Sequence, residues 1–500
     1  MMKRVITWIS VKKINQITVI LLIAILSQLG LSSPVAAIDM TLEQALDMAM
    51  TNSPTIRNTR LNLEMSERNL WAQQASLKSQ FNLTVTPFRF SKDRVFDDRF
   101  SEYYTIEQTS SAASLSILQP IKWTDGTLRI VEDFDWRESS SSLVGTEKDK
   151  SYRNSLYLSL NQPLFTYNRT QMRIKELELA LENAQLNFAI QRLQIERQVT
   201  QEFLSLYFRQ RSVEISKEEL ANATESYEII RSKVEAGISA EEELFQADLT
   251  QANSRASLEN SQIQFENSLD NFKILLGLSL DDDLQVVTNV EKNVVDINLM
   301  QAMNHGLQNR MELRQRDIDI QYALDDLIRA GSENEFLASV DLTYGIVGTD
   351  SLFGDIYRSP TRNQMVEIKL NIPLFDWGKK KHQIESSRKR VEQERISADE
   401  EQKQVKYQIR QACRNLLNQK TQIEIAEKNV INARRTYEIN LERYRNGDLS
   451  SKDIEFYQTQ LSREQLNEIS ALINYQVALL DLKIRSLWDF SRNQAVIALQ

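Results

Sequence analysis

Two hydrophobic periodicities alternate along this chain of 500 residues. Over about 168–236, apolar side chains recur every three or four residues, and no glycine or proline interrupts the segment before Gly237. The pattern returns over about 377–446, and shorter stretches follow to about Leu276 and Trp488. This spacing is typical of coiled-coil helices, and ~70 residues would make a rod of roughly 100 Å. The chain is therefore predicted to be mostly helical, with two long hairpins that reverse near Gly237 and Gly447.

Between the helical segments the period shortens to two residues, which indicates strands. Apolar and polar residues alternate over 81–90, 157–160 and 366–370, and aromatic residues are dense between 81 and 165. The stretch 127–136 also has the pattern of a strand, whereas 139–151 has the composition of a polar loop. This alternation suits a transmembrane β-barrel with apolar residues outward and polar residues inward. It also suits a small soluble sheet that caps the helices, and alternation alone does not distinguish the two.

The sequence contains an internal duplication. Residues 160–165 (Leu-Asn-Gln-Pro-Leu-Phe) recur as 370–375 (Leu-Asn-Ile-Pro-Leu-Phe), and the same offset of 210 relates Gly237 to Gly447. Upstream, Leu42 and Arg57 match Leu299 and Arg314 at an offset of 257. The difference between the offsets places 47 additional residues in the first half, between about 80 and 160.

The additional residues contain a weaker repeat of their own. Residues 116–121 (Ser-Ile-Leu-Gln-Pro-Ile) resemble residues 159–164 at an offset of 43. A duplicated hairpin is the simplest explanation, and it predicts four strands in the first half and two in the second. Both Gln-Pro pairs should then lie at the same end of the sheet.

These patterns predict the domain organisation. Residues 1–37 are a signal peptide, and 491–500 are a C-terminal tail. The first repeat, 38–290, contains a helix that begins at Thr41 and runs to about Lys78, strands over about 80–163, and a helical hairpin. The second repeat, 291–490, contains a helix, strands over about 336–372 and a helical hairpin. Thr41 and Gln44 have the spacing of a capping box at the start of the first helix.

The N-terminus has the features of a secretory signal. Lys3, Arg4, Lys12 and Lys13 precede an apolar run, and small residues around Ala37 offer a cleavage site. No other apolar stretch is long enough to span a bilayer as a helix. The mature chain is therefore expected to leave the cytoplasm.

Composition excludes several functional classes. The chain has 1 Cys and 2 His, so disulfide frameworks and zinc fingers are excluded. Its net charge of −9 lacks the basic footprint of a nucleic-acid-binding protein. It contains no nucleophile–base constellation and no phosphate-binding glycine loop. We predict no enzymatic activity, no cofactor, no metal and no nucleic-acid partner.

The ordered duplication resembles the TolC-like outer membrane efflux proteins, over about 40–490. The motifs that carry the resemblance are the segments Leu42-Glu43-Gln44-Ala45-Leu46, Asn52-Ser53-Pro54, Ile56-Arg57 and Asp376-Trp377-Gly378, together with the two Pro-Leu-Phe junctions and the two glycine turns. The resemblance implies a mostly α fold in which coiled-coil hairpins form a periplasmic tunnel and strands contribute to a trimeric transmembrane β-barrel.

The same resemblance implies function and partners. The chain would be a homotrimeric exit duct in the outer membrane of a Gram-negative-type cell, in contact with outer-membrane lipid. It would work with a periplasmic adaptor protein and an inner-membrane transporter of the RND or ABC type. The family has four strands per protomer and twelve in the barrel, whereas a duplicated hairpin would give six and eighteen. The sequence does not identify the cargo.

Candidate site residues follow from the resemblance at matching positions. The hairpin tips that meet the adaptor would contain Lys233, Gly237, Ile238, Arg443 and Gly447. The entrance gate would contain Tyr444 and Asp453, with Glu243 as the equivalent of Asp453 in the first half. The family's second gate aspartate is replaced by Phe456, which indicates an apolar constriction. The strand-to-helix junctions contain Pro163, Phe165, Pro373 and Phe375.

A secreted periplasmic coiled-coil scaffold without a pore is the alternative function. The two hypotheses predict different behaviour when isolated membranes are washed with high salt or carbonate. A barrel stays in the membrane because lipid surrounds its apolar surface, and we expect this result. Release of the mature chain into the wash would instead identify the scaffold.

Overall fold

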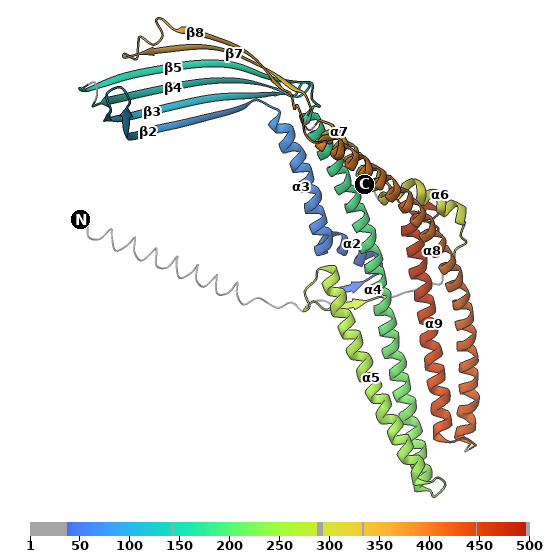
Figure 1. Cartoon of the computed structure of the whole chain (residues 1–500). Coiled ribbons are helices and arrows are strands. Elements are labelled where there is room, and N and C mark those ends of the chain that lie inside the picture. The colour runs from blue at the N-terminus through green and yellow to red at the C-terminus, as the bar shows by residue number, and fades with distance from the viewer. Residues whose placement is uncertain (1–37, 143–144, 288–293, 333–334, 447, 497–500) are drawn as a thin grey trace, which may run out of the picture. The chain divides into compact units, whose positions relative to one another are not determined.

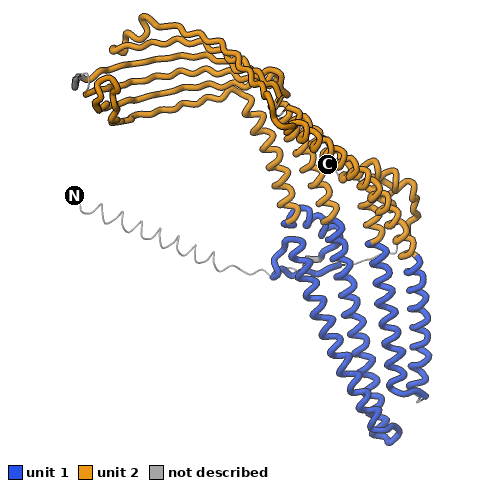
Figure 2. The backbone as a smooth tube through the Cα atoms, viewed as in Figure 1, with its two compact units in different colours: residues 1–54, 196–292, 421–477 blue, residues 55–195, 293–420, 478–500 orange. Residues whose placement is uncertain are grey.

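The computed structural model describes residues 38–142, 145–287, 294–332, 335–446 and 448–496. The predicted signal peptide and Gly447 lie outside these residues. The chain forms two compact units (Figure 2). Unit 1 comprises Met1–Pro54, Glu196–Lys292 and Thr421–Val477, and unit 2 comprises Thr55–Ile195, Asn293–Lys420 and Ala478–Gln500. Each unit thus combines segments from both halves of the sequence.

The first helix of each half is interrupted at equivalent positions. The single helix predicted from Thr41 to Lys78 is wrong, because α2 (Leu42–Asn52) ends before α3 (Pro54–Ser76) begins. Pro54 lacks a backbone N–H and forces Ser53 into an extended conformation, with ψ of 129°. In the second half, α6 (Leu299–Asn309) and α7 (Met311–Ser332) are separated at Arg310. The capping box of Thr41 and Gln44 is confirmed.

The long helices match the prediction closely. The helices α4 (Arg169–Glu235) and α8 (Lys379–Arg445) each have 67 residues, and α5 (Glu241–Leu276) and α9 (Ser451–Ser486) each have 36 (Figure 1). Equal lengths confirm that no insertion interrupts the repeated hairpin. In α8, buried side chains follow the predicted seam at Val405, Ile409, Ala412 and Leu416. Cys413 is buried beside this seam, as expected for a packed thiol.

Six antiparallel strands lie side by side in one sheet of unit 2 (Figure 1). Its order is β2-β3-β4-β5-β7-β8, which confirms four strands from the first half and two from the second. The strand bounds are Gln80–Asp97, Glu102–Ile121, Gly126–Ser141, Gly145–Leu164, Leu337–Asp350 and Thr361–Asn371.

The polar loop predicted over 139–151 is wrong for most of its length, because β4 continues to Ser141 and β5 begins at Gly145. Ser139 pairs with Asp149, and Glu138 pairs with Lys150. The backbone hydrogen bonds between paired strands do not require apolar side chains, so polar residues can belong to a strand. A strand needs only about 9–11 residues to cross a bilayer, so strands of 18 and 20 residues have polar ends beyond any apolar band.

The strand geometry confirms the duplicated hairpin. The strands β3 and β5 each have 20 residues and are offset by 43 positions. The Gln119 side-chain amide donates to the carbonyls of Pro120 and Leu77, at 2.8 and 3.0 Å. The Gln162 amide donates equivalently to Pro163 and Thr124, at 2.9 and 2.8 Å. Both Gln-Pro pairs therefore lie at the helix-proximal end of the sheet, as predicted.

Two short ladders complete the described secondary structure. The strand β1 (Ile38–Met40) pairs in parallel with β6 (Leu284–Val286), and β9 (Trp488–Asp489) pairs with β10 (Gln494–Ala495). At the end of α5, Gly277 has φ of 74°, and a Cβ there would lie 2.7 Å from the Asn52 carbonyl oxygen. Among the described helices, none carries an apolar stretch long enough to cross a bilayer.

The turn between β3 and β4, residues 122–125, is fastened to the start of α4. The Asn168 side-chain amide donates to the carbonyls of Lys122 and Trp123, at 2.8 and 3.1 Å. The Asn168 side-chain oxygen accepts from the Gln171 N–H at 2.8 Å, as an N-cap does. Asp125 accepts from the Thr170 N–H at 3.1 Å. One helix terminus therefore holds the turn in place.

Replacing Asn168 by Ala should remove both the cap and the clamp. Loss of an N-cap costs about 1–2 kcal/mol of unfolding free energy, which chemical unfolding followed by circular dichroism would measure. Lys217→Ala is the matched control, because Lys217 is an exposed residue within α4. Equal stability of the two variants would contradict the clamp.

Candidate functional site

The two faces of the six-stranded sheet differ in chemistry. Successive residues point to opposite faces, and cross-strand partners share a face. One face, named here the apolar face, contains Phe81, Leu83, Val85, Leu115, Ile117, Leu128, Ile130, Leu156, Leu158, Leu160, Leu342, Tyr344, Val366, Ile368 and Leu370. The opposite, mostly polar face contains Asn82, Thr84, Ser114, Ser116, Arg129, Asp133, Ser155, Ser159, Thr343, Glu367 and Lys369.

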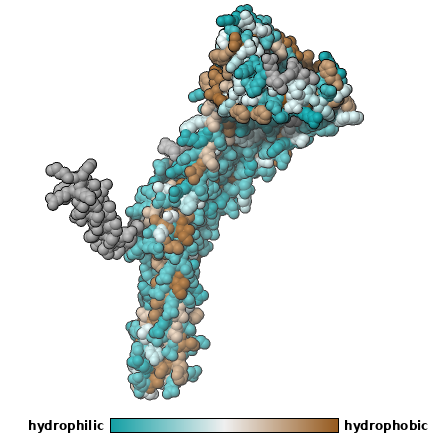
Figure 3. Space-filling model, turned by 90° about the vertical axis from the view of Figure 1, so that its left-hand side faces the viewer, coloured by the Kyte–Doolittle hydropathy of each residue, from teal (hydrophilic) through white to brown (hydrophobic). Residues whose placement is uncertain are grey.

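The apolar face has no covering layer. Phe81 and Leu83 are each 68 % exposed, and Val366 is 72 % exposed. Brown, hydrophobic patches lie on the sheet part of unit 2 (Figure 3). A contiguous apolar surface that spans six strands is larger than soluble monomers tolerate. Its composition suits contact with lipid acyl chains.

Charged groups on the polar face bond to one another. The Lys369 ammonium lies 3.3 Å from Asp341 and 3.1 Å from Glu367. The Asn161 side-chain amide also donates to Asp341. The Lys369 and Glu367 side chains are 60 % and 44 % exposed, so these charges stay in contact with solvent and the face is suited to an aqueous lumen.

The predicted junction residues lie where the strands meet the long helices. Pro163 is still within β5, and Pro373 follows β8. The exposed ring of Phe165 lies 5.8 Å from Phe336, and the exposed ring of Phe375 packs edge-on against Trp377 at 4.6 Å. Exposed aromatic rings beside an apolar band are typical of a membrane–water interface.

Asp376 caps the start of α8 at the second junction. Its carboxylate accepts from the backbone N–H groups of Lys380 and Gly378, each at 2.9 Å. These donors, that of Lys380 foremost, hold the pKa of Asp376 below its ordinary value. The capped carboxylate also suits the positive end of the helix dipole.

Tyr444 joins the two helical hairpins near their ends in unit 1. Its side chain is 1 % exposed and packs with Ile230 of α4, Ala247 of α5 and Ile454 of α9. Its hydroxyl donates to the Ser226 carbonyl at 3.5 Å, and burial raises its pKa. The structure therefore places this predicted gate residue in a core shared by all four helices.

Polar contacts that the sequence did not predict reinforce this core. The Thr250 hydroxyl of α5 donates to Glu455 of α9 at 3.0 Å, and the Gln458 amide donates to the Glu219 carbonyl at 3.2 Å. The Arg445 guanidinium lies 3.4 Å from Glu225. These residues are distant in sequence, and no local motif marks them.

The tip residues are arranged around the turns. Gly237 has φ of 70° and open space around its Cα, while the neighbouring Ile238 is 75 % exposed. The Lys233 ammonium lies 3.4 Å from the Tyr444 carbonyl oxygen and 5.5 Å from the centre of the Tyr444 ring. Arg443 contributes its backbone carbonyl to the Asp448 N–H at 2.8 Å.

The other predicted gate residues lie at helix starts. The Asp453 carboxylate accepts from the N–H and hydroxyl of Ser450, at 3.2 and 2.7 Å, and the hydroxyl bond is the main cause of its lowered pKa. Glu243 accepts from the Ser239 hydroxyl at 3.2 Å. Phe456 is 60 % exposed, so it is available to line a constriction.

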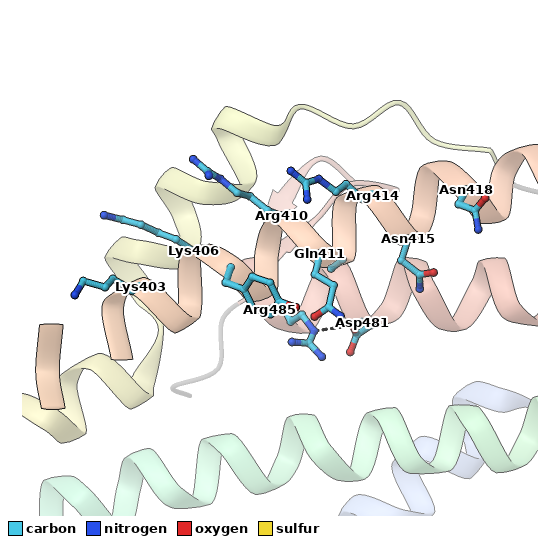
Figure 4. A pocket seen from close by; sticks show the side chains of 11 residues that line it. Lys403, Lys406, Arg410, Gln411, Arg414, Asn415, Asn418, Asp481 and Arg485 are labelled. Atoms are coloured by element: carbon cyan, nitrogen blue, oxygen red, sulfur yellow. Dashed lines mark hydrogen bonds and ion pairs between the residues drawn. The ribbon is translucent and has the colours of Figure 1, made fainter. Parts of the chain in front are cut away.

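A basic cavity of about 890 Å³ lies along α8 in unit 2 (Figure 4). Lys403, Lys406, Arg410 and Arg414 line it, together with the ion pair Asp481–Arg485 at 2.6 Å. Intervals of three and four residues could have identified this basic stripe in the sequence. In the described residues, no group of three or more side chains could hold a metal ion.

Comparison with known proteins identifies a family for this chain and solved structures with a similar fold. Residues 132–278 and 297–484 match the family described as outer membrane efflux protein. No curated protein sequence matches the chain. Among solved structures, a membrane protein from Pseudomonas aeruginosa is similar, with a TM-score of 0.68, 15 % identity and coverage of 93 % of this chain and 94 % of that one.

Two other solved structures share this fold. The CmeC outer membrane channel of Campylobacter jejuni has a TM-score of 0.65 and 17 % identity, over 91 % of this chain and 87 % of that one. The open state of the MtrE outer membrane channel of Neisseria gonorrhoeae has a TM-score of 0.65 and 14 % identity, over 91 % and 93 %. The predicted fold class, helical hairpins with a TolC-like sheet, is thereby confirmed.

The core around Tyr444 predicts how the hairpins respond to substitution. Tyr444→Ala should leave a cavity, cost roughly 3–5 kcal/mol and raise hydrogen exchange in both tips. Tyr444→Phe keeps the ring and loses one long hydrogen bond, so it should cost only about 1 kcal/mol. Hydrogen-exchange mass spectrometry of peptides around Ile230 and Ile454 would compare them. Similar exchange in both variants would exclude packing as the dominant interaction.

Proposed function

Because this chain belongs to the outer membrane efflux protein family, we propose that three copies form an exit duct for substrates. The protein is located in the outer membrane and extends into the periplasm. In the proposed complex, an inner-membrane transporter supplies energy and cargo, and a periplasmic adaptor docks at the hairpin tips. The similar proteins CmeC and MtrE are described as outer membrane channels, so we propose transport and not catalysis.

The exposed apolar face of the sheet is the observation that carries this proposal. Acyl chains are the solvent in which six strands of Leu, Ile, Val and Phe can remain uncovered. The polar face would then line water. A secreted scaffold without a pore would have to expose the same surface to water, at a cost of about 25 cal/mol per Å². This comparison favours the membrane channel.

One copy of the sheet cannot close by itself. Its outer strands are β2 and β8, which leave unpaired backbone groups at both edges. Lipid offers no hydrogen bonds to such groups, so each β2 must pair with β8 of another copy. We propose a trimer because the family resemblance implies this number.

The helices of unit 1 support contacts between copies. On α5, the exposed apolar residues Phe245, Leu249 and Ile263 have no partner layer, and on α8 the same holds for Ile425 and Ile439. The helix α5 contains seven acidic and two basic residues, whereas the part of α8 that belongs to unit 1, residues 421–445, contains five basic and four acidic residues. With net charges of −5 and +1 the electrostatic attraction is small, so contact between α5 of one copy and α8 of the next would depend on these exposed apolar residues.

The shared core around Tyr444 suggests a mechanism for opening. In a closed entrance, one such core in each copy would hold the two hairpins of that copy together. Docking of an adaptor near Ile238 and the residues around Gly447 would favour a splayed arrangement, in which the hairpins of each copy separate. Packed cores switch between discrete states more readily than they deform, which suits a two-state gate.

Asp453 would place one carboxylate per copy at this entrance. A ring of three carboxylates attracts cations, and a change of about 1 kcal/mol alters a permeability ratio roughly fivefold. Asp453→Asn should therefore lower the cation-to-anion permeability ratio of the open channel by about this factor, as measured by reversal potentials in planar bilayers.

Two control variants separate the charge of Asp453 from its capping role. Asp453→Glu keeps the charge and should retain selectivity. Asp453→Ala removes both charge and cap, so it should lower selectivity as Asn does and also weaken the start of α9. Unchanged selectivity in the Asn and Ala variants would remove Asp453 from the gate.

A further inference from the structure

The hairpin formed by β2 and β3 is an addition to one edge of the sheet. It duplicates the β4–β5 hairpin, down to the hydrogen bonds of Gln119 and Gln162. The family match begins at residue 132, within β4, and therefore after this hairpin. The question is whether the hairpin enters the wall of the closed barrel or lies outside it.

Ladder geometry favours a place in the wall. The strand β4 pairs with β5 on one side and with β3 on the other, and the β3–β4 register runs unbroken from Ile106–Ser141 to Ile121–Gly126. If the hairpin lay outside, β4 would have to pair with β8 of the next copy. That arrangement would break the whole β3–β4 ladder, and lipid could not satisfy the freed backbone groups.

The side chains of the hairpin also favour a place in the barrel wall. On the apolar face it presents Phe81, Leu83 and Ile117, which continue the lipid-like surface of β4 and β5. On the polar face, small residues dominate: Asn82, Thr84, Thr86, Ala112, Ser114 and Ser116. Small polar residues line a lumen without filling it. The hairpin therefore has both the outward and the inward face of a barrel wall.

We propose that the β2–β3 hairpin is part of the barrel wall and widens the pore to eighteen strands, so that it admits bulky hydrophilic cargo. The inference rests on the trimeric channel proposed above. With strands ~4.8 Å apart and tilted about 40°, eighteen strands enclose a backbone diameter of roughly 36 Å, against roughly 24 Å for twelve. Barrels of this strand number hold an aqueous channel.

The turn at residues 122–125 supplies the necessary support. Each copy contributes six strands, and the turn between β3 and β4 has no helix of its own. The clamp by Asn168 and Asp125 attaches it to α4 instead. Eighteen strands are thus connected to the same set of long helices. The barrel would then no longer be the part of the duct that limits the size of the cargo. The hairpin tips would set that limit instead.

Distances between spin labels in the full-length trimer would test the proposal. Ser159→Cys on the polar face of β5 carries the label, in a Cys413→Ala background that removes the native thiol. Three backbone positions on a circle of radius 18 Å are about 31 Å apart, whereas a radius of 12 Å gives about 21 Å, and labels that point into the lumen shorten both distances by the same amount. We expect the longer distance, measured by pulsed electron resonance in membranes.

A shortened variant that lacks residues 80–122 is the matched control. It joins Ser79 to Trp123, removes β2 and β3, and keeps the label, so its distance should be about 10 Å shorter. A distance in the full-length protein that corresponds to a backbone radius of about 12 Å, after allowance for the length of the label, would place the hairpin outside the barrel and overturn the inference. The full-length distance decides this even if the shortened variant does not fold. Absence of any membrane-inserted trimer would overturn the proposed channel itself.

Discussion

The hydrogen-bonding requirement of strand edges is the constraint on which this molecule depends. A six-stranded sheet with an uncovered apolar face is stable neither in water nor alone in lipid. Water disfavours the apolar face, and lipid disfavours the two edges. The proposed association of copies would satisfy both requirements, because it would pair β2 with β8 and leave only the apolar face toward lipid. In the proposed channel, oligomerisation is thus a condition of folding in the membrane.

The helical hairpins meet a different requirement. They must extend far from the membrane without a globular core, and they do so with continuous seams such as Val405, Ile409, Ala412 and Leu416. A seam of this kind tolerates no insertion, since one added residue rotates the apolar stripe away from its partner helix. This explains why the two long helices have equal lengths while the strands between them differ in number. The two halves of the chain therefore differ in the sheet, where a hairpin can be added at an edge.

The additional hairpin shows how such an insertion is accommodated. Its strands extend a ladder that continues an existing register, and its turn needs only one anchor, supplied by Asn168 at the start of α4.

The proposed entrance gate, in contrast, depends on contacts between separate helices. Tyr444 was identified from a family position, but its burial against Ile230 and Ala247 depends on helices that lie about 200 residues away in the sequence. The bonds of Thr250 and Gln458 across the hairpins had no local signal at all.

The sequence by itself determined what local periodicity can encode: the lengths of the long helices, the repeat offset of 210, and the four-plus-two division of strands. It could not determine the break at Ser53, because a proline within an apolar helical pattern can start a helix or kink one. Nor could it extend β4 and β5 through residues 139–151, where ladder bonds hold polar residues that resemble a loop. Tertiary structure alone decided which side chains meet at the hairpin ends, because those contacts arise from the packing of separate helices.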